Sequence, residues 1–201
     1  MNDEINIPLD LLQKTFEDTA NIDLQNAFEC SSRGDTVGAL EHLNHAIRFR
    51  PRKGILYRTR ALIYFEKRKF KEAISDFSLS IKYSKDISRD YFMIAICKTE
   101  LGRHNESLPY FSNAIKYFQD QPSDDGENAG STMKYNIADI YFSRGKALNT
   151  LKMYYEARQD FLKAAEINPV FRTTYQKLYS FIEKPQYKQK PVTKSGLFDL
   201  F

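Results

Sequence analysis

The sequence lacks most of the patterns that mark enzymes, cofactor sites and membrane proteins. Its 201 residues include eight glycines, three histidines and two cysteines. No Gly-rich phosphate loop occurs, and no Ser-His-Asp or Cys-His order has supporting motif context. No run approaches eighteen apolar residues, so we expect no membrane span. These absences predict a non-enzymatic protein that needs no cofactor.

The few cysteines and histidines point to the same conclusion. Cys30 and Cys97 fall in separate helical patterns and are expected to be buried thiols in a reducing compartment. Residues 1–8 are acidic without a long apolar run, so no signal peptide is expected and the predicted location is cytoplasmic. His42 and His45 are three apart on a helix, but the sequence offers no third ligand nearby, so no metal site is predicted.

Charge is balanced enough to disfavour nucleic acid as the partner. The formal net charge is +4 and the pI is about 8.9. This mild excess permits an acidic partner but does not indicate nucleic-acid binding. The densest basic run is Lys67, Arg68, Lys69 and Lys71, which is interpreted as a solvated turn or, alternatively, a phosphate or lipid contact.

What the sequence does contain is a repeat. Small residues recur at 34-residue spacing and then once more 50 residues further on, at Ala39, Ala73, Ser107 and Ala157. Four residues after each comes a bulky apolar residue, and three later another small one; these are Leu43, Phe77, Phe111 and Phe161, then Ala46, Ser80, Ala114 and Ala164. Small residues let two helices approach closely, while the bulky residue fills the space between successive units. Two units end in proline, Pro51 and Pro169, which cannot continue a helix.

A 34-residue helix–turn–helix period resembles the tetratricopeptide repeat family. The resemblance implies an all-α fold, a right-handed superhelical solenoid of four repeats with a C-terminal capping helix. We place the lead-in at residues 1–19, the repeats at 20–53, 54–87, 88–121 and 138–171, and an insertion at 122–137. A cap helix at 172–183 and a basic tail with an apolar end at 184–201 complete the chain. An ordinary antiparallel helical bundle is the alternative to this solenoid.

In such solenoids the first helices of the repeats line a concave groove, which predicts the binding residues. They are Leu24 and Phe28 from the first repeat, Arg58, Leu62 and Phe65 from the second, Arg89, Phe92, Met93 and Ile96 from the third, and Phe142, Ser143 and Lys146 from the fourth. An apolar groove with a basic rim suits a partner's peptide or amphipathic helix with acidic flanks. Alternatively, the chain's own tail fills the groove with Leu197, Phe198, Leu200 and Phe201.

Family members that dock chaperones hold a terminal carboxylate with Lys, Asn, Asn, Lys and Arg. The corresponding positions here are Leu24, Phe28, Thr59, Arg89 and Met93. Only Arg89 matches, so this carboxylate clamp is not predicted.

The layout also resembles the N-terminal domain of the NADPH oxidase activator subunit. The shared features are four repeats, sixteen extra residues before the fourth, and a tail carrying Lys177, Leu178, Tyr179, Pro191, Val192, Gly196, Leu197 and Phe198. This resemblance implies binding of a Rac-type GTPase at the inter-repeat loops. The positions expected to do so are Arg52, Lys53, Lys85, Asp86 and Asp125 in the insertion. A structural role in a larger assembly is a third alternative.

Overall fold

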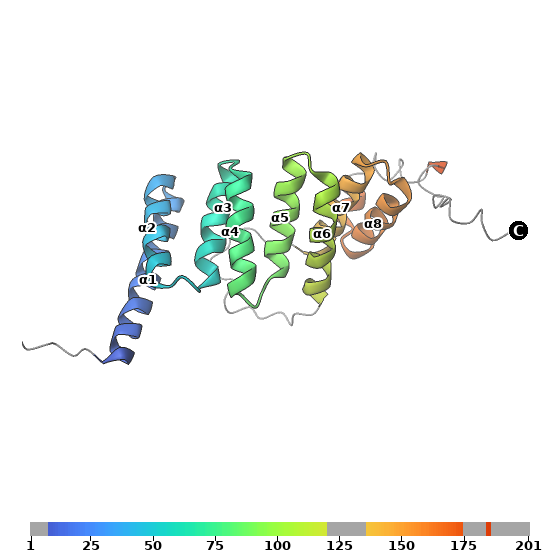
Figure 1. Ribbon diagram of the computed structural model, residues 1–201. Coiled ribbons are helices and arrows are strands. Elements are labelled where there is room, and N and C mark those ends of the chain that lie inside the picture. The colour runs from blue at the N-terminus through green and yellow to red at the C-terminus, as the bar shows by residue number, and fades with distance from the viewer. Residues whose placement is uncertain (1–7, 120–135, 175–183, 186–201) are drawn as a thin grey trace, which may run out of the picture. The chain divides into compact units, whose positions relative to one another are not determined.

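The computed structural model describes residues 8–119, 136–174 and 184–185. The described chain is built of helices, with no β-strand in these ranges (Figure 1). The helices are α1 (Leu9–Ser32), α2 (Thr36–Phe49), α3 (Gly54–Glu66), α4 (Phe70–Tyr83), α5 (Ser88–Glu100), α6 (His104–Gln119), α7 (Ile137–Thr150), α8 (Tyr154–Ile167) and α9 (Val170–Thr174). The all-α class and the helix–turn–helix order are therefore confirmed.

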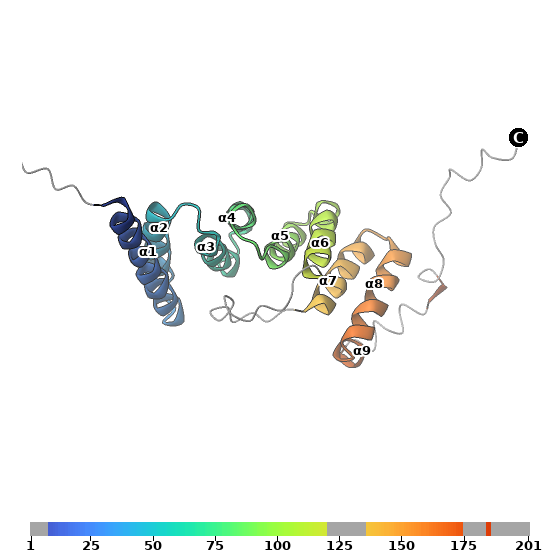
Figure 2. The same ribbon diagram turned by 90° about the horizontal axis from the view of Figure 1, so that it is seen from below.

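The chain divides into two compact units, Met1–Cys97 and Lys98–Phe201. In the first unit, helices α1 to α5 follow one another in chain order, and α1–α2 and α3–α4 form antiparallel hairpins (Figures 1 and 2). In the second unit α7 and α8 form a hairpin, and α6 and α9 pack against α7 and α8 respectively.

The repeated small and bulky residues form the core of both units. The four small residues that open the pattern, from Ala39 to Ala157, are fully buried. So are Leu43, Phe77 and Phe111, while Phe161 retains only 4% of its surface. The second set of small residues, from Ala46 to Ala164, is fully buried as well. The spacing that predicted the repeat is thus the spacing of helix–helix contact, where any larger side chain would separate the backbones.

Each turn between the two helices of a repeat ends its first helix with the same backbone motif. The residue at this turn has positive φ in all four repeats: Gly34 (79°), Arg68 (57°), Gly102 (73°) and Lys152 (62°). Its N–H bonds the carbonyl three residues back at 2.9–3.0 Å, and the next N–H bonds five residues back at 2.8–2.9 Å. This is the Schellman arrangement, in which glycine is favoured because a Cβ is strained at positive φ. Two of the four positions nevertheless carry a basic side chain.

A forked ion pair joins the two helices of the second and the fourth repeat. Arg60 on α3 donates from Nε and Nη2 to the two carboxylate oxygens of Asp76 on α4, at 2.7 and 2.8 Å. Arg144 on α7 makes the same fork with Asp160 on α8, at 2.7 Å for both bonds. Both aspartates are buried. Burial raises the pKa of Asp160, and the hydrogen bonds from Arg144 oppose that shift.

The same two arginines also reach the preceding repeat. The remaining nitrogen of Arg60 donates to Asn44 on α2 at 2.6 Å, and that of Arg144 donates to Ser112 on α6 at 3.1 Å. Asn44 and Ser112 are equivalent positions, 68 residues apart. One arginine therefore fixes three helices within each unit, a device that the apolar pattern did not predict.

The predicted domain boundaries meet the helices in different ways. Helix α1 is continuous from Leu9 to Ser32, so the boundary proposed at residue 19 falls inside one helix. Residues 120–121 of the third repeat, 122–135 of the insertion and 175–183 of the cap helix lie outside the described residues. Of the predicted cap, α9 (Val170–Thr174) covers the first turn.

Candidate interaction surface

One face of α3 is left open by the packing of its neighbours. Ile55, Thr59, Leu62 and Glu66 follow one another at steps of four and three, so they share one side of the helix. Ile55 and Leu62 are half-buried and Glu66 is exposed, whereas Thr59 is buried and donates to the carbonyl of Ile55 at 2.9 Å. Ile55 also packs against the buried cluster of Ala20, Ala46 and Leu56, so the apolar surface left on this face is mainly that of Leu62.

Equivalent positions on α1 and α5 extend this face into a row. Phe28, Leu62 and Ile96 are 34 residues apart and each is half-buried. We call these three side chains the apolar row. Helix α3 packs on the first hairpin, where Ile63 joins a buried cluster with Ala27. Because successive repeats stack in the same register, we expect these equivalent side chains to lie along one side of the first unit.

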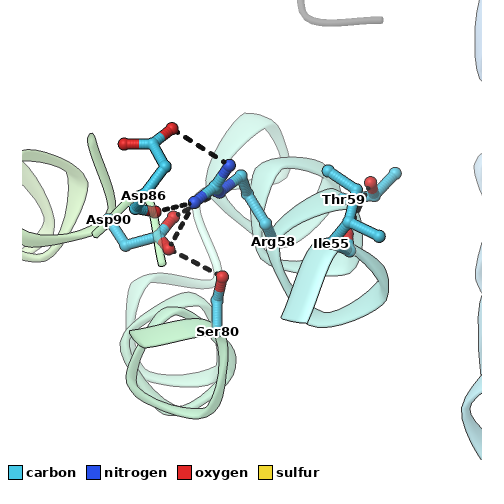
Figure 3. Close-up of polar contacts among 6 residues, drawn as sticks. All are labelled: Ile55, Arg58, Thr59, Ser80, Asp86 and Asp90. Atoms are coloured by element: carbon cyan, nitrogen blue, oxygen red, sulfur yellow. Dashed lines mark hydrogen bonds and ion pairs between the residues drawn. The ribbon is translucent and has the colours of Figure 1, made fainter. Parts of the chain in front are cut away.

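Arg58 ties α3 to α5 and does not belong to the open face. Its Nε donates to Oδ1 of Asp90 at 2.8 Å and its Nη2 to Oδ2 at 3.0 Å. Nη2 also donates to the carbonyl of Asp86, while Nη1 lies 3.5 Å from the Asp86 carboxylate. The hydroxyl of Ser80 donates to Asp90 at 2.6 Å. Figure 3 shows Arg58 pointing toward these carboxylates and away from Ile55 and Thr59.

The Arg58–Asp90 pair is deeply buried on both sides. The side chain of Arg58 keeps 7% of its surface and that of Asp90 none. Burial raises the pKa of Asp90, while the hydrogen bonds from Arg58 and Ser80 oppose the rise. Such a pair fixes the register of two helices, since a wrong register would leave a buried charge without a partner. Arg58 is thus a structural residue, contrary to its predicted place on a basic groove rim.

Several other predicted groove residues are also part of the core. Arg89, Phe92 and Met93 on α5 are buried. Leu24 on α1 is half-buried and packs against the clusters formed by α1, α2 and α3. Burial of the three α5 side chains and the packing of Leu24 leave these residues little surface for a ligand.

In the second unit the predicted groove residue Phe142 is covered from within the chain. Its ring lies 5.6 Å from that of Phe161 and is stacked on Phe171 at 4.9 Å. The open positions beside it on α7 are polar: Ser143 is half-buried and Lys146 is exposed. Lys146 occupies the place equivalent to Ile96, so the apolar row ends within the first unit.

Phe65 and the basic run lie together at the end of α3. Phe65 is half-buried and packs edge-on against Phe70, with ring centroids 5.8 Å apart. The guanidinium of Arg68 lies 5.3 Å above the Phe70 ring. Lys67, Arg68, Lys69 and Lys71 are all exposed. We call these four residues the basic turn.

The residues predicted for a GTPase-binding edge are partly engaged elsewhere. Lys53 donates to Asn21 at 2.6 Å, and Asp86 contacts Arg58 as described. Arg52 and Lys85 are exposed. Asp125 and the tail residues Leu197, Phe198, Leu200 and Phe201 lie outside the described residues.

The structure supplies the third polar group that the sequence did not place near the two histidines. Nδ1 of His42 is 2.9 Å from one carboxylate oxygen of Asp23, and Nδ1 of His45 is 2.5 Å from the other. Asp23 is on α1, so this contact is one polar link within the first hairpin, beside the ion pair of Glu17 with Arg50 at 3.2 Å. In the described part of the chain, no three His, Cys, Asp or Glu residues are arranged to hold a metal ion.

None of the described helices has the length and apolar character of a membrane span.

The polar residues that sequence reasoning missed left a signal in the repeat register. Arg60 and Asp76 are sixteen apart, as are Arg144 and Asp160, and the two pairs are displaced by the same 84 residues as the repeats that contain them. A register comparison of charged residues would have found them. Asp90 has no such signal, because it is the sole acid at its repeat position, where Ile22, Leu56 and Ile140 stand in the other repeats.

Comparison with known proteins finds similarity to tetratricopeptide repeats. Residues 138–171 match the tetratricopeptide repeat family. The TPR repeat-containing thioredoxin TDX of Arabidopsis thaliana is 30% identical over 104 residues, which make up 52% of this chain and 27% of that protein. The match therefore spans only about a quarter of that relative.

Solved structures agree on the fold. The crystal structure of MamA has a TM-score of 0.68 at 14% identity, over 86% of this chain and 85% of that one. YrrB, described as a TPR protein with an unusual peptide-binding site, has a TM-score of 0.62 at 18% identity, over 88% and 86%. The TPR2B domain of yeast Sti1, in complex with pHsp70, has a TM-score of 0.54 at 19% identity, over 66% and 98%. Residues 138–171 match a tetratricopeptide repeat, and the described helices share the all-α solenoid fold of these solved structures.

Proposed function

We propose that this protein is a non-enzymatic adaptor that holds a peptide or amphipathic helix of a partner protein on the apolar row of its first unit. Tetratricopeptide proteins act in protein–protein interaction, and the YrrB and Sti1 structures carry a peptide-binding site and a bound pHsp70 respectively. These similarities support a binding role. The location on the row is our inference from the packing described above.

The observation that carries this proposal is the apolar row itself. Phe28, Leu62 and Ile96 stay half-buried after the hairpins have packed, at the same position of three successive repeats. A ligand that covers them removes apolar surface from water, which stabilises the complex by about 25 cal/mol per Å² buried. A peptide that crosses the three helices can place one apolar side chain on each of them.

Because Arg58 and Arg89 are buried, they are not available to bind an acidic group of the ligand. Arg58 and Arg89 were the cations predicted to recognise acidic groups in the groove, and both are buried. Exposing Arg58 to a ligand would require breaking its bonds to Asp90, which lies at the interface of two repeats. The ligand should therefore bind the row through apolar contacts rather than through a carboxylate placed at these arginines.

The test is a matched set of apolar-to-acid substitutions. Leu62→Glu and Ile96→Glu place a charge on the row, and we expect each to weaken partner capture by at least about tenfold, since a charge would be desolvated in the complex. Val37→Glu on α2 is the control, because Val37 is 68% exposed and lies off the row. Helical circular dichroism should be unchanged in all three variants. Partner capture that survives Leu62→Glu combined with Ile96→Glu would refute the site.

The phenylalanines of the groove prediction are poor choices for this test. Phe92 and Phe142 retain only 8% of their surface, so truncation to alanine opens a cavity in the core. Such changes cost about 3–5 kcal/mol and would reduce binding by unfolding the protein.

Three alternative functions can be tested separately. If the tail occupies the apolar row, deletion of residues 184–201 should raise the affinity for the partner. Binding of a Rac-type GTPase, implied by the likeness to the NADPH oxidase activator, predicts capture that depends on the bound nucleotide and is lost on deletion of residues 124–130. A structural role in a larger assembly predicts co-elution with a stoichiometric complex. The cytoplasmic location stays a prediction, which imaging of the tagged chain would test.

A further inference from the structure

The turn between α3 and α4 differs in charge from the equivalent turns of the other repeats. Residues 66–72 read Glu-Lys-Arg-Lys-Phe-Lys-Glu, with four cations and two carboxylates, a net charge of +2. The equivalent segments 32–38, 100–106 and 150–156 have net charges of 0, −1 and 0 with histidine neutral. The excess positive charge therefore belongs to this one repeat and is not a general property of the turns.

The lysines of the basic turn are not used to hold the fold. Lys67, Lys69 and Lys71 are exposed and form no ion pair within the described chain. Elsewhere in the chain lysines do pair at short range, as Lys98 does with Glu106 at 2.8 Å. Four like charges within five residues repel one another, so the turn would be more stable with fewer of them.

Arg68 adds a second cost at the same place. It occupies the left-handed position with φ of 57°, where the first and third repeats have Gly34 and Gly102. A side chain there costs on the order of 1 kcal/mol relative to glycine. Lys152 carries the same cost in the fourth repeat, so backbone strain alone does not distinguish the turn between α3 and α4. This turn differs from the others because it combines backbone strain with clustered positive charge.

The basic turn is continuous with the apolar row. Leu62 precedes Lys67 by five residues, which is about 7.5 Å along a helix. Phe65 follows Leu62 by three residues, and its ring packs on Phe70, which stands between Lys69 and Lys71 in the sequence. A ligand seated on Leu62 and directed toward the end of α3 would pass the exposed Glu66 and then reach the cations of the basic turn.

We propose that the basic turn selects acidic residues placed next to the apolar anchor of the bound peptide. This inference rests on the proposed function of the apolar row. An acidic peptide fits better than nucleic acid or a lipid surface, because the cations adjoin half-buried apolar side chains and the whole chain has a net charge of only +4. Charges at the edge of an interface mainly set specificity and association rate, which is the role expected here.

The experiment selects peptides of about twelve residues from a random displayed library on the full chain. Three proteins are compared: the wild type, Lys67→Ser with Lys69→Ser and Lys71→Ser, and a control that removes three exposed cations elsewhere, Lys14→Ser with Arg48→Ser and Lys82→Ser. We expect the wild type and the control to enrich apolar residues together with Asp or Glu. The basic-turn variant should enrich the apolar residues alone.

The affinity of a selected peptide then measures how much its acidic residues contribute to binding. Replacing its Asp and Glu residues by the amides should weaken binding to the wild type by roughly tenfold at low salt, and the basic-turn variant should show little difference between the two peptides. The wild-type preference should shrink between about 0.05 and 0.3 M salt, because exposed charges are screened. Arg68→Gly should bind the acidic peptide more weakly while melting at a higher temperature, since it loses a cation and a strained residue together.

The outcomes separate the two proposals. If no peptide is enriched over a Leu62→Glu, Ile96→Glu protein, the apolar row itself is refuted. If apolar peptides are enriched without acidic residues, or the acidic preference survives in the basic-turn variant, the row stands and this inference is overturned. It is also overturned if the basic turn is required instead for binding an oligonucleotide or vesicles containing phosphatidylserine.

Discussion

The left-handed residue at the turn of each repeat provides a direct test of how this chain balances strain. Lys152 has φ of 62° and is exposed, and no contact of its side chain is evident in the described chain. Replacing it with glycine removes the clash between Cβ and backbone without removing a packing contact. Gly102, at the same position of the third repeat, allows the reverse change, since a Cβ added there would meet no atom within 4 Å.

The expected size follows from two opposing terms. A non-glycine residue at positive φ costs about 1–2 kcal/mol in the folded state. Glycine also gives the unfolded chain more conformational freedom, which lowers the free energy of unfolding by about 0.4–1 kcal/mol. Lys152→Gly should therefore stabilise the protein by about 0.5–1 kcal/mol, and Gly102→Ala should destabilise it by a similar amount. For a chain of this length that is a shift of roughly 1–4 °C in melting temperature.

The assay is thermal and urea unfolding followed by circular dichroism, with Lys152→Ala as the control. This control removes the long side chain but retains the Cβ, so its stability should stay near that of the wild type. A Lys152→Gly protein that is no more stable than Lys152→Ala would refute the strain argument. So would a neutral Gly102→Ala, because no side-chain contact is available to compensate there.

Three further predictions concern the core. Arg58→Met should lower the free energy of unfolding by about 3–5 kcal/mol, because it leaves Asp90 buried without its cation. Adding Asp90→Leu should recover at least half of that loss. If the losses of the two substitutions simply add, the pairing is contradicted. Gly145→Ala should destabilise by about 1–3 kcal/mol, since its Cβ would lie 2.7 Å from a ring carbon of Phe161, and Phe161→Leu should relieve the effect. Burial raises the pKa of Asp160 above its ordinary 3.8, which favours the neutral carboxyl in the fold. Relative to Asp160→Asn, wild-type stability should therefore fall as pH rises from below 3.8 through the folded pKa, and a rise in urea titrations would contradict this.

The helices and their core were predictable from the sequence because they depend on spacing. The small–bulky–small pattern from Ala39 to Ala164 specifies where two helices can touch, and it recurs four times in register. Glycine at 34 and 102 likewise marks the turns. Periodicity carries this information because an α-helix presents every third and fourth residue on one side.

The candidate site was only partly predictable. Phe28, Leu62 and Ile96 were assigned to an open surface, and all three are half-buried in the folded chain. Arg58 and Phe142 satisfied the same positional rule but are buried by residues far away in sequence, Asp90 and Phe171. A repeat position tells which way a side chain points, whereas its exposure depends on which neighbour covers it.

The sequence by itself thus determined the repeat, the helix boundaries near each turn and the small and bulky core residues at the repeated positions. Tertiary structure decided which charges are structural and which remain for a partner. The physical reason is that apolar burial depends on the residue type at a periodic position, while a charge is satisfied only by a specific opposite group brought near in space. Arg58 found such a group in Asp90, and the lysines of the basic turn have none among the described residues.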